Sequence, residues 1–433
     1  MFRGAFGADK NMIFSEFAQV SRDKSARQGE IALMKIMPKN ILLTITALIF
    51  LSAIFSTLSC TKNEPPAIIG AALALSGPAA SVGEDVRNGL LLAAEEINEQ
   101  GGINGSRVQI MVRDAVAQGK SLSGGDGSPS DDPAQKAFEE LLQADPLVVV
   151  SSLSFLSMKL APVAEAKKRL LVGLVATVPA LTQGRDWVYR YWPTAEHEAP
   201  PMTDIFLKIG SQNDTDNSVK VINSPTEVSL PLSLGVIYLD DDYGVSVFAD
   251  MVKRSKDKGI KVIPSPFSSD NKDFSVTVNA VKDTKAVAVI GFDFHIIKTL
   301  KALRAIKYKG EIISTTTATL PSVTSTPESS GVYLTAPALY NKNYPFADEV
   351  RKRYEEKYGK PFTQYAANGY DFVYILIGLL EDKPMNQDTV KAIFEKGFVY
   401  SGLFGNIELK KGSKDILFPL FPAQIVNGEI IYR

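Results

Sequence analysis

The stretch IIGAALALSGPAASVGEDVRNGLLLAAEEINEQGGINGSRVQIMVRD, from Ile68 to Asp114, predicts one strand–helix–strand unit. Its apolar opening, Ile68–Leu75, is typical of a strand that is buried on both faces. Apolar residues then recur at helical spacing between Gly83 and Gln100. A glycine-rich turn, Gly101–Gly105, leads into a second strand at Val108–Val112. The stretch therefore predicts a βαβ unit, which places its two strands in parallel.

Strand and helix patterns continue to alternate downstream, as far as a helix that is expected to end near Leu380. Repeated βα units predict parallel sheets with helices on both faces. The 433 residues suffice for two lobes, each with its own core. Two polar stretches, Lys120–Asp132 and Ser211–Ser229, interrupt the alternation. We expect solvated loops there, with a loop that docks a partner as the alternative.

The charge balance of the chain argues against a nucleic-acid partner. Its 47 Lys and Arg residues are matched by 48 Asp and Glu residues, and no basic run stands out. A protein that binds nucleic acid concentrates positive charge on one surface. We therefore expect no nucleic acid among its partners.

Motifs for catalysis are missing from the sequence. The two histidines, His197 and His295, have no metal-ligand spacing and are expected at the surface or at the rim of a site. There is no nucleophile elbow, no Walker A loop and no dinucleotide fingerprint. The sequence thus predicts a protein that is not an enzyme, with no cofactor, no metal and no catalytic residue.

The N-terminal region has the pattern of a lipoprotein signal. Basic residues lie within Met34–Asn40, an uncharged apolar run covers Ile41–Phe55, and Cys60 follows shortly after. Residues 34–59 are predicted to be a secretory signal peptide, with Cys60 as the lipidated first residue of the mature chain. A transmembrane anchor is the alternative, although spanning a bilayer takes about 20 apolar residues. Thr57 stands where a lipobox usually carries Leu, Val or Ile.

On that interpretation residues 60–67 form a tether, and the protein is extracytoplasmic and anchored to a membrane by lipid. Residues 1–33 precede the signal and have no clear pattern. They are expected to be an extension upstream of the true start, at Met34 or Met37, or a disordered segment.

A ligand site can be placed from the strand pattern. Ligands of open α/β sheets bind beyond the carboxyl ends of the strands. Ser154 and Thr177 both follow such ends, each just before a predicted helix, near Ser157 and near Pro179 respectively. Helix N-termini offer unpaired N–H groups and partial positive charge, which favour a carboxylate. Capping of the helices is the alternative role of the two side chains.

Several segments together resemble one known family. ALSGPAASVGEDVRNGLLLAAEEINEQGGINGSRVQIMVRDA is similar to the start of type I periplasmic binding proteins of the leucine/isoleucine/valine-binding kind. VVVSSLSFLS, LLVGLVATVPALT, LGVIYLDDDYG and VAVIGFDFHIIKTLKALRAIKYKG resemble later segments of that family in order, and the likeness covers nearly all of 68–430. It implies two Rossmann-like α/β lobes with parallel sheets and a hinged cleft between them. Lobe 1 would comprise 68–194 and 338–419, and lobe 2 would comprise 195–337 and 420–433.

The resemblance also implies a set of ligand contacts. In amino-acid-binding members a serine and an alanine–threonine pair hold the ligand carboxylate, and aromatic residues cover the ligand. Val82 takes the place of an aromatic residue that is common at the lobe 1 wall, which would leave a roomier pocket. Any single aromatic could instead be a packing residue. The positions that correspond to ligand contacts are Val82, Ser154, Val175, Ala176, Thr177, Tyr243, Phe292, Thr316 and Tyr365.

One position departs from the family pattern. Amino-acid binders hold the ligand ammonium with a carboxylate of the second lobe, and Thr316 occupies that position here. Glu196 or Glu198, in the neighbouring crossover segment, could supply an acid. A buried ammonium without an anion is costly. A carboxylate without an amine, or a small neutral polar ligand, is therefore expected to fit about as well as an α-amino acid.

These features predict a solute-binding lipoprotein that delivers a small organic ligand to an ABC permease complex in the membrane. Its two lobes would close over the ligand about a hinge. A sensory or cell-envelope regulatory lipoprotein on the same fold is the alternative, because a fold does not fix a function.

Overall fold

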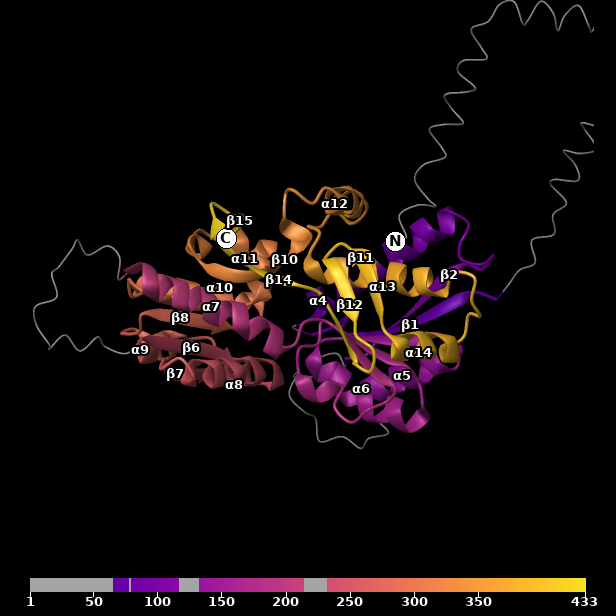
Figure 1. Ribbon diagram of the computed structural model, residues 1–433, viewed down its shortest axis with the longest axis horizontal. Helices are drawn as coiled ribbons and strands as arrows, with labels where there is room; N and C mark the ends of the chain where they lie inside the picture. The colour runs from indigo at the N-terminus through magenta and orange to yellow at the C-terminus, as the bar shows by residue number, and fades with distance from the viewer. Residues whose placement is uncertain (1–64, 78, 117–131, 214–231) are drawn as a thin grey trace, which may run out of the picture. The chain divides into compact units, whose positions relative to one another are not determined.

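The computed structural model describes residues 65–77, 79–116, 132–213 and 232–433. The predicted extension, signal peptide and Cys60 lie outside the described residues, as do most of the tether and of the two polar loops. Within the described part, the chain forms two mixed α/β sheets (Figure 1). Lobe 1 denotes the part built on the eight-stranded sheet, and lobe 2 the part built on the seven-stranded sheet.

The lobe 1 sheet has the strand order β11-β12-β13-β5-β4-β3-β1-β2. The predicted βαβ opening is present, with β1 parallel to β2. β3, β4 and β5 extend the parallel part, and the C-terminal β13 lies parallel to β5. The strands are β1 (Ala67–Leu73), β2 (Val108–Asp114), β3 (Val148–Ser152), β4 (Leu171–Leu174), β5 (Val188–Tyr191), β11 (Phe398–Gly402), β12 (Gly405–Leu409) and β13 (Asp415–Leu417).

The lobe 2 sheet has the strand order β15-β14-β10-β9-β8-β6-β7. Its strands β6 to β10 are parallel to one another, whereas β14 is antiparallel to both β10 and β15. The strands are β6 (Ser233–Leu239), β7 (Lys261–Phe267), β8 (Ala286–Ile290), β9 (Glu311–Ser314), β10 (Tyr333–Pro337), β14 (Leu420–Val426) and β15 (Glu429–Tyr432).

The predicted α/β class with parallel sheets is confirmed for the body of both lobes. The C-terminal hairpins differ, because a two-residue turn can join only antiparallel strands. Leu403 and Phe404 form such a turn between β11 and β12, and Asn427 and Gly428 form another between β14 and β15.

Helices cover both sheets. They are α4 (Ala80–Glu99), α5 (Pro133–Leu142), α6 (Ser154–Lys167), α7 (Ala195–Asn213), α8 (Asp242–Lys256), α9 (Ser275–Val281), α10 (Asp293–Ala305), α11 (Pro321–Thr324), α12 (Phe346–Tyr358), α13 (Gln364–Leu380) and α14 (Gln387–Lys396). Short 3-10 turns are η2 (Pro179–Leu181), η3 (Thr316–Thr319), η4 (Pro327–Ser329) and η5 (Ala338–Tyr340). Among the described helices, none combines the length and the apolar character that a membrane span requires.

Glycines set the packing of α4 against α13. A Cβ atom on Gly89 would lie 1.9 Å from the carbonyl oxygen of Ala366, and one on Gly369 would lie 2.4 Å from that of Val86. The two helices therefore approach with backbone against backbone, which only glycine permits. α13 is thereby held on lobe 1, although it follows the whole of the lobe 2 sheet up to β10 in the sequence.

The chain passes between the two lobes three times: after β5, after β10, and between β13 and β14. Because of these crossings, the C-terminal strands complete both sheets, as the yellow strands of Figure 1 show. Apolar clusters fill both faces of each sheet, and the strand Val148–Val150 is buried as its sequence predicts. Three connections place the loops after β3 and β4 opposite those after β6, β8 and β9.

Candidate functional site

A cavity of about 510 Å³ lies where loops of the two lobes meet. Lobe 1 contributes the residues that follow β3 and β4, and lobe 2 contributes those that follow β6, β8 and β9. This is the carboxyl edge of both parallel sheets, where α/β proteins bind ligands. Seven of the predicted ligand contacts line the cavity: Ser154, Val175, Thr177, Tyr243, Phe292, Thr316 and Tyr365.

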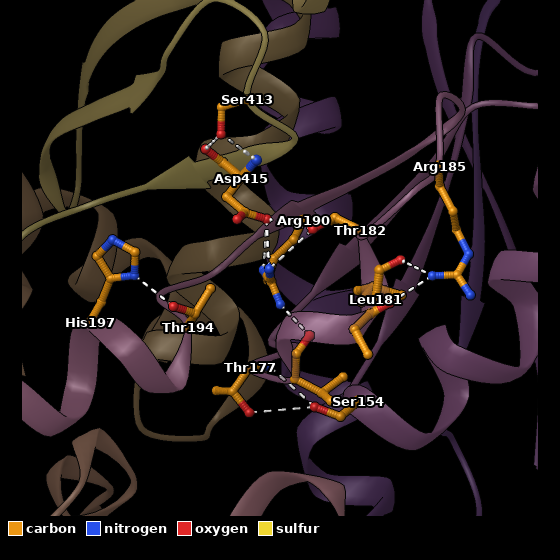
Figure 2. Close-up of polar contacts among 12 residues, drawn as sticks. Ser154, Thr177, Leu181, Thr182, Arg185, Arg190, Thr194, His197, Ser413 and Asp415 are labelled. Atoms are coloured by element: carbon orange, nitrogen blue, oxygen red, sulfur yellow. Dashed lines mark hydrogen bonds and ion pairs between the residues drawn. The ribbon is translucent and has the colours of Figure 1, made fainter. Parts of the chain in front are cut away.

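Ser154 and Thr177 are directly connected in lobe 1. The Ser154 hydroxyl accepts a hydrogen bond from the Thr177 backbone N–H at 3.1 Å, and it lies 3.5 Å from the Thr177 hydroxyl (Figure 2). Ser154 is the first residue of α6, and no side chain caps that helix. The alternative that Ser154 caps its helix is therefore wrong for this structure, since its hydroxyl joins the ends of β3 and β4 instead. The helix begins at Ser154, three residues before its predicted start.

The second predicted helix N-terminus is a weaker feature than expected. The segment after Thr177 forms η2, a three-residue 3-10 turn, and not a full helix. Its aligned peptide dipoles are too few to attract an anion on their own. The polar groups that the ends of β3 and β4 bring to the cavity are thus the two hydroxyls and the N-terminus of the 14-residue α6.

Two residues of this edge have strained backbones. Leu153 has φ +66° and ψ +154°, and Val175 has φ +56°. Each directly follows a strand, β3 or β4, and each lines the cavity. Non-glycine residues avoid positive φ, and a β-branched residue avoids it most strongly. Such strain persists only where the surroundings impose it, and it is common at ligand sites.

An ion pair fixes the turn that carries Thr177. Arg190 of β5 is 1% exposed, and its Nη2 lies 2.7 Å from Asp415 Oδ1 of β13 (Figure 2). Arg190 Nη1 donates to the carbonyl oxygen of Val178, the residue after Thr177. Burial lowers the pKa of Arg190, and Asp415 opposes that effect. Sequence reasoning missed this pair, although an arginine within the apolar strand 188–191 was a usable signal.

Aromatic side chains from both lobes form the walls of the cavity. The rings of Tyr243 and Phe292, in lobe 2, lie 6.5 Å apart. Those of Trp192 and Tyr365, in lobe 1, lie 5.9 Å apart, and the sequence did not point to Trp192. The Tyr243 hydroxyl lies 2.8 Å from that of Thr315. Burial raises the pKa of Tyr243 and of Tyr365, so both phenols are neutral.

Glu198 supplies the acid that the sequence left unplaced. It lies on α7, is 0% exposed and lines the cavity. Its Oε1 accepts hydrogen bonds from the Thr316 hydroxyl at 2.5 Å and from the Thr316 N–H at 3.3 Å. Burial raises its pKa to about 7, against the two bonds from Thr316. Glu196, the other candidate, is exposed and does not line the cavity.

Helical spacing held a signal for Glu198. Ala195, Ala199 and Met202 of α7 are fully buried, and Glu198 belongs to the same face, three residues after Ala195 and four before Met202. An acidic residue on the apolar face of a helix is expected to have a specific partner or function.

Two residues of the predicted set lie elsewhere. Ala176 is buried in the lobe 1 core and does not line the cavity. Val82 lines a second cavity, of about 240 Å³, which shares Phe292 and Tyr365 with the first. The small Val82 side chain thus borders a separate space behind the shared aromatic wall.

The remaining charges of the main cavity are Lys159 of α6 and the run Asp240–Asp242 before and within α8. Asp241 caps α8 by accepting the Gly244 N–H at 2.9 Å, and burial raises its pKa to about 6. In the described part of the chain, no cluster of His, Cys, Asp and Glu is arranged to hold a metal ion. His197 is exposed, whereas His295 is fully buried against Phe267, which corrects the expectation for that residue.

Comparisons with known proteins agree with this architecture. The family model described as "Periplasmic binding protein" matches residues 66–429. A Leu/Ile/Val-binding protein homolog 8 of Brucella abortus (strain 2308) is 26% identical over 228 residues, covering 51% of this chain and 50% of the relative. BraC3, a Leu/Ile/Val-binding protein of Rhizobium johnstonii, is 26% identical over 255 residues, covering 58% and 60%. The chain thus aligns with about half the length of these curated relatives.

Solved structures share the fold at low identity. A leucine-binding protein, LivK, of Thermotoga maritima superposes with a TM-score of 0.68 at 19% identity, covering 84% of this chain and 97% of that one. The Streptococcus pneumoniae protein LivJ, in complex with isoleucine, superposes with a TM-score of 0.67 at 18% identity, covering 84% of this chain and 97% of that one. An ABC-transporter solute-binding protein of Rhodopseudomonas palustris, in complex with 3,4-dihydroxybenzoic acid, superposes with a TM-score of 0.68 at 17% identity. The match covers 85% of this chain and 95% of that one.

Members of this family are solute-binding proteins. The family model spans most of the chain, and the two-sheet fold matches its solved relatives. This chain belongs to the periplasmic binding protein family, in its leucine/isoleucine/valine-binding branch with the type I fold.

Proposed function

We propose that this protein is the extracytoplasmic solute-binding component of an ABC importer, and that it binds a small organic ligand without transforming it. The observation that carries the proposal is the cavity of about 510 Å³, whose polar groups come from both lobes. Pockets of about 300–1,000 Å³ suit small organic molecules. An amino-acid-like ligand, or another small carboxylate or amide, fits this size.

The polar groups of the cavity favour a ligand with a carboxylate. The hydroxyls of Ser154 and Thr177 and the N-terminus of α6 form one end of the cavity. Hydroxyl groups and helix N–H groups donate to carboxylate oxygens. The isoleucine and the 3,4-dihydroxybenzoic acid bound by the two structural relatives both carry a carboxylate. We infer the same group for the ligand of this protein.

Lobe closure is the proposed mechanism of capture. Ser154, Val175 and Thr177 belong to lobe 1, whereas Glu198, Tyr243 and Thr316 belong to lobe 2. A ligand that touches both sets binds the closed arrangement more tightly than an open one, and it therefore shifts the population towards closure. The three crossings between lobes are the segments about which such a hinge would turn.

Family membership implies an extracytoplasmic location, and the lipid anchor is part of our proposal. The signal pattern that ends at Cys60 supports an anchor at that residue. Labelling with a palmitate analogue tests it. We expect the protein to take up the label and a Cys60→Ala variant to take up none; label that persists in the variant would refute the anchor.

A thermal-shift screen of the purified protein against amino acids, organic acids and amides tests the function. A ligand at 100 times its Kd adds about 2.7 kcal/mol to the free energy of unfolding. We expect at least one compound with a carboxylate to raise the Tm, and the double variant Ser154→Ala/Thr177→Val to reduce that shift. A folded protein that responds to no compound, or a double variant that binds as well as the parent, would contradict the proposal.

A further inference from the structure

A histidine of lobe 2 is buried beside Phe292, whose side chain lines both cavities. His295, the third residue of α10, is 0% exposed. Its Nδ1 accepts the backbone N–H of Phe292 at 3.3 Å, and its Nε2 lies 3.2 Å from the carbonyl oxygen of Ser269. Because a backbone N–H only donates and a carbonyl oxygen only accepts, the ring proton is on Nε2 and none is on Nδ1. The two bonds therefore select the neutral imidazole in one tautomer.

His295 joins two loops at the carboxyl edge of the lobe 2 sheet. Phe292 lies between β8 and α10, and Ser269 lies in the loop that follows β7. In the capping box of many helices, a Glu or Gln three residues after the N-cap accepts the N–H of the N-cap residue. His295 has that place relative to Phe292. A Gln keeps its acceptor at every pH, whereas an imidazole loses its acceptor when it gains a second proton.

The packing around His295 leaves the ring little freedom. Its centroid lies 3.9 Å from that of Phe294 and 5.0 Å from that of Phe267. A Cβ atom on Gly291 would lie 3.1 Å from the Cβ of His295, a close approach that glycine permits without displacement. The imidazole is stacked on the ring of Phe292, with 5.9 Å between the centroids. Because close-packed interiors transmit small shifts, the position of Phe292 depends on that of the imidazole.

Burial decides the protonation of His295. It lowers the pKa of the imidazole, and the bond to Ser269 opposes this effect only in part. On α10 itself, Lys298 and Asp293 act in opposite directions. Of the elements that pack against α10, η4 carries Glu328, whereas α9, α11, η3 and β8 carry no charged residue. The charged residues of the loop after β7 are exposed: Asp270, Lys272 and Asp273. The fold therefore favours the neutral ring.

We propose that His295 is a positioning residue of the ligand site: as a neutral imidazole it holds the loop that carries Phe292, and the site takes up its ligand only in that form. This inference rests on the proposed function and adds a regulation by pH to the same site. A proton taken from solvent turns Nδ1 from an acceptor into a donor, which then faces the donor N–H of Phe292. The bond to Ser269 survives, so Phe292 is the residue that must move. Ligand affinity should therefore fall in acid.

Nuclear magnetic resonance tests the tautomer on the protein without ligand. The chain has two histidines, so ring 15N-labelled histidine gives two sets of signals, and a His197→Gln variant assigns them. At pH 7.5 we expect Nδ1 of His295 to be unprotonated and scalar-coupled to the Phe292 amide across the hydrogen bond. Acid should protonate it with a midpoint below the ordinary pKa of 6.5, and the coupling should vanish in the same step.

Calorimetry on the same protein measures the effect on binding. The probes are L-isoleucine and 3,4-dihydroxybenzoic acid, the ligands of two structural relatives, and every compound that raises the Tm in the thermal-shift screen. When only one form of a protein binds, the apparent Kd is the intrinsic Kd divided by the fraction of that form. The apparent Kd should therefore double at the pH at which half of His295 is protonated, and it should go on rising at lower pH.

Two variants separate the proton from the bond. His295→Gln offers an acceptor to the Phe292 N–H and has no proton to gain. It should bind as tightly as the parent at pH 7.5 and lack the doubling, which leaves only the pH dependence of other groups such as Asp241 and Glu198. His295→Leu removes the acceptor and should bind about fivefold more weakly even at pH 7.5. His197→Gln replaces the exposed histidine and should keep the profile of the parent.

Thermal unfolding establishes that each variant is folded, and the comparison of resonance with calorimetry needs the parent alone. A proton on Nδ1 of His295 at pH 7.5 would overturn the inference, as would an apparent Kd that stays level while His295 titrates. A folded His295→Gln that loses affinity in acid as the parent does would also overturn it. These results leave binding at pH 7.5, and with it the proposed function, intact. A panel from which nothing binds at pH 7.5 would refute the function and its regulation together.

Discussion

The hydroxyl of Ser154 accepts the backbone N–H of Thr177 at 3.1 Å, and through this bond the first turn of α6 holds the loop that follows β4. The two residues are 23 positions apart, and both line the cavity. The hydroxyl thus has two expected roles, to position Thr177 and to contact the ligand.

Ser154→Ala is expected to weaken ligand binding by about 1–3 kcal/mol, since a half-buried polar partner of the ligand is lost. The free energy of unfolding should fall by about 1 kcal/mol. Calorimetric titration and urea denaturation measure the two effects. Ser157→Ala is the control. Ser157 lies on the same helix as Ser154 and its hydroxyl is 2.7 Å from that of Ser151 in β3, but it does not line the cavity. Equal losses of affinity in both variants would contradict a direct role for Ser154.

The strained backbone at Val175 predicts that a glycine variant is more stable than an alanine variant, which reverses the usual order. Glycine is usually less stable than alanine by about 0.5–1 kcal/mol, because it has more conformational freedom to lose. At φ +56° alanine retains a steric cost of about 1–2 kcal/mol that glycine avoids. Val175→Gly should therefore unfold at a higher urea concentration than Val175→Ala. An alanine variant that is the more stable of the two would show that the backbone is not strained.

Replacing Arg190 and replacing Asp415 should lower the free energy of unfolding by unequal amounts. Arg190 is 1% exposed and the Asp415 side chain is 25% exposed, so an unpaired Arg190 is the costlier of the two to leave behind. Asp415→Asn should destabilise the protein by about 3 kcal/mol, and Arg190→Met by less. Urea denaturation measures both. The exposed pair Lys342–Glu429 is the control, where Lys342→Met should cost under about 1 kcal/mol.

Arg190→Met also tests the position of the Thr177 loop. The variant loses the bond from Arg190 to the Val178 carbonyl, so the loop should become less ordered and the ligand should bind more weakly. Unchanged ligand affinity in a folded Arg190→Met variant would limit the pair to a role in stability.

Glu198 predicts the pH dependence of stability without ligand. Its pKa is raised from 4.5 to about 7, so the folded protein binds this proton more tightly than the unfolded chain does. The free energy of unfolding therefore falls as the pH rises from about 4.5 to 7, and the contribution of Glu198 to it is least favourable above pH 7. Glu198→Gln should be more stable than the parent at pH 8, by an amount on the order of 3 kcal/mol, and nearly equal to it at pH 4.

Buried Asp371, with a pKa raised to about 8, adds a slope of the same sign, so the quantity to measure is the difference between variant and parent at each pH. A difference that stays constant from pH 4 to pH 8 would mean that Glu198 does not titrate in this range.

Local pattern in the sequence predicted the elements and the edge at which they end. Alternation of strand and helix is visible in the spacing of apolar residues, and the carboxyl ends of parallel strands share one edge. This rule pointed to Ser154 and Thr177, and the family resemblance added Val175, Tyr243 and Phe292. The structure brings all five to one cavity. Whether they contact a ligand is still a prediction.

Tertiary structure decided what depends on contacts between distant segments. α6 begins at Ser154, earlier than predicted, because the strained residue Leu153 and the bond from Thr177 to Ser154 set the turn. Glu198 could be assigned to the buried face of its helix from spacing alone. Its position in the cavity, beside Thr316, follows from the crossing after β5 and the packing of α7 in lobe 2.

The sequence by itself determined the α/β class, the family and the residues at one end of the cavity, because these depend on patterns within short segments. Only the tertiary structure supplied the acid opposite that end and the arginine that fixes its loop. Glu198 and Thr316 are 118 residues apart, and Arg190 and Asp415 are 225 apart. Glu198 meets Thr316 through the packing of α7 in lobe 2, and Arg190 meets Asp415 only after the chain has returned to lobe 1 and added β13 to its sheet. No local spacing encodes either arrangement.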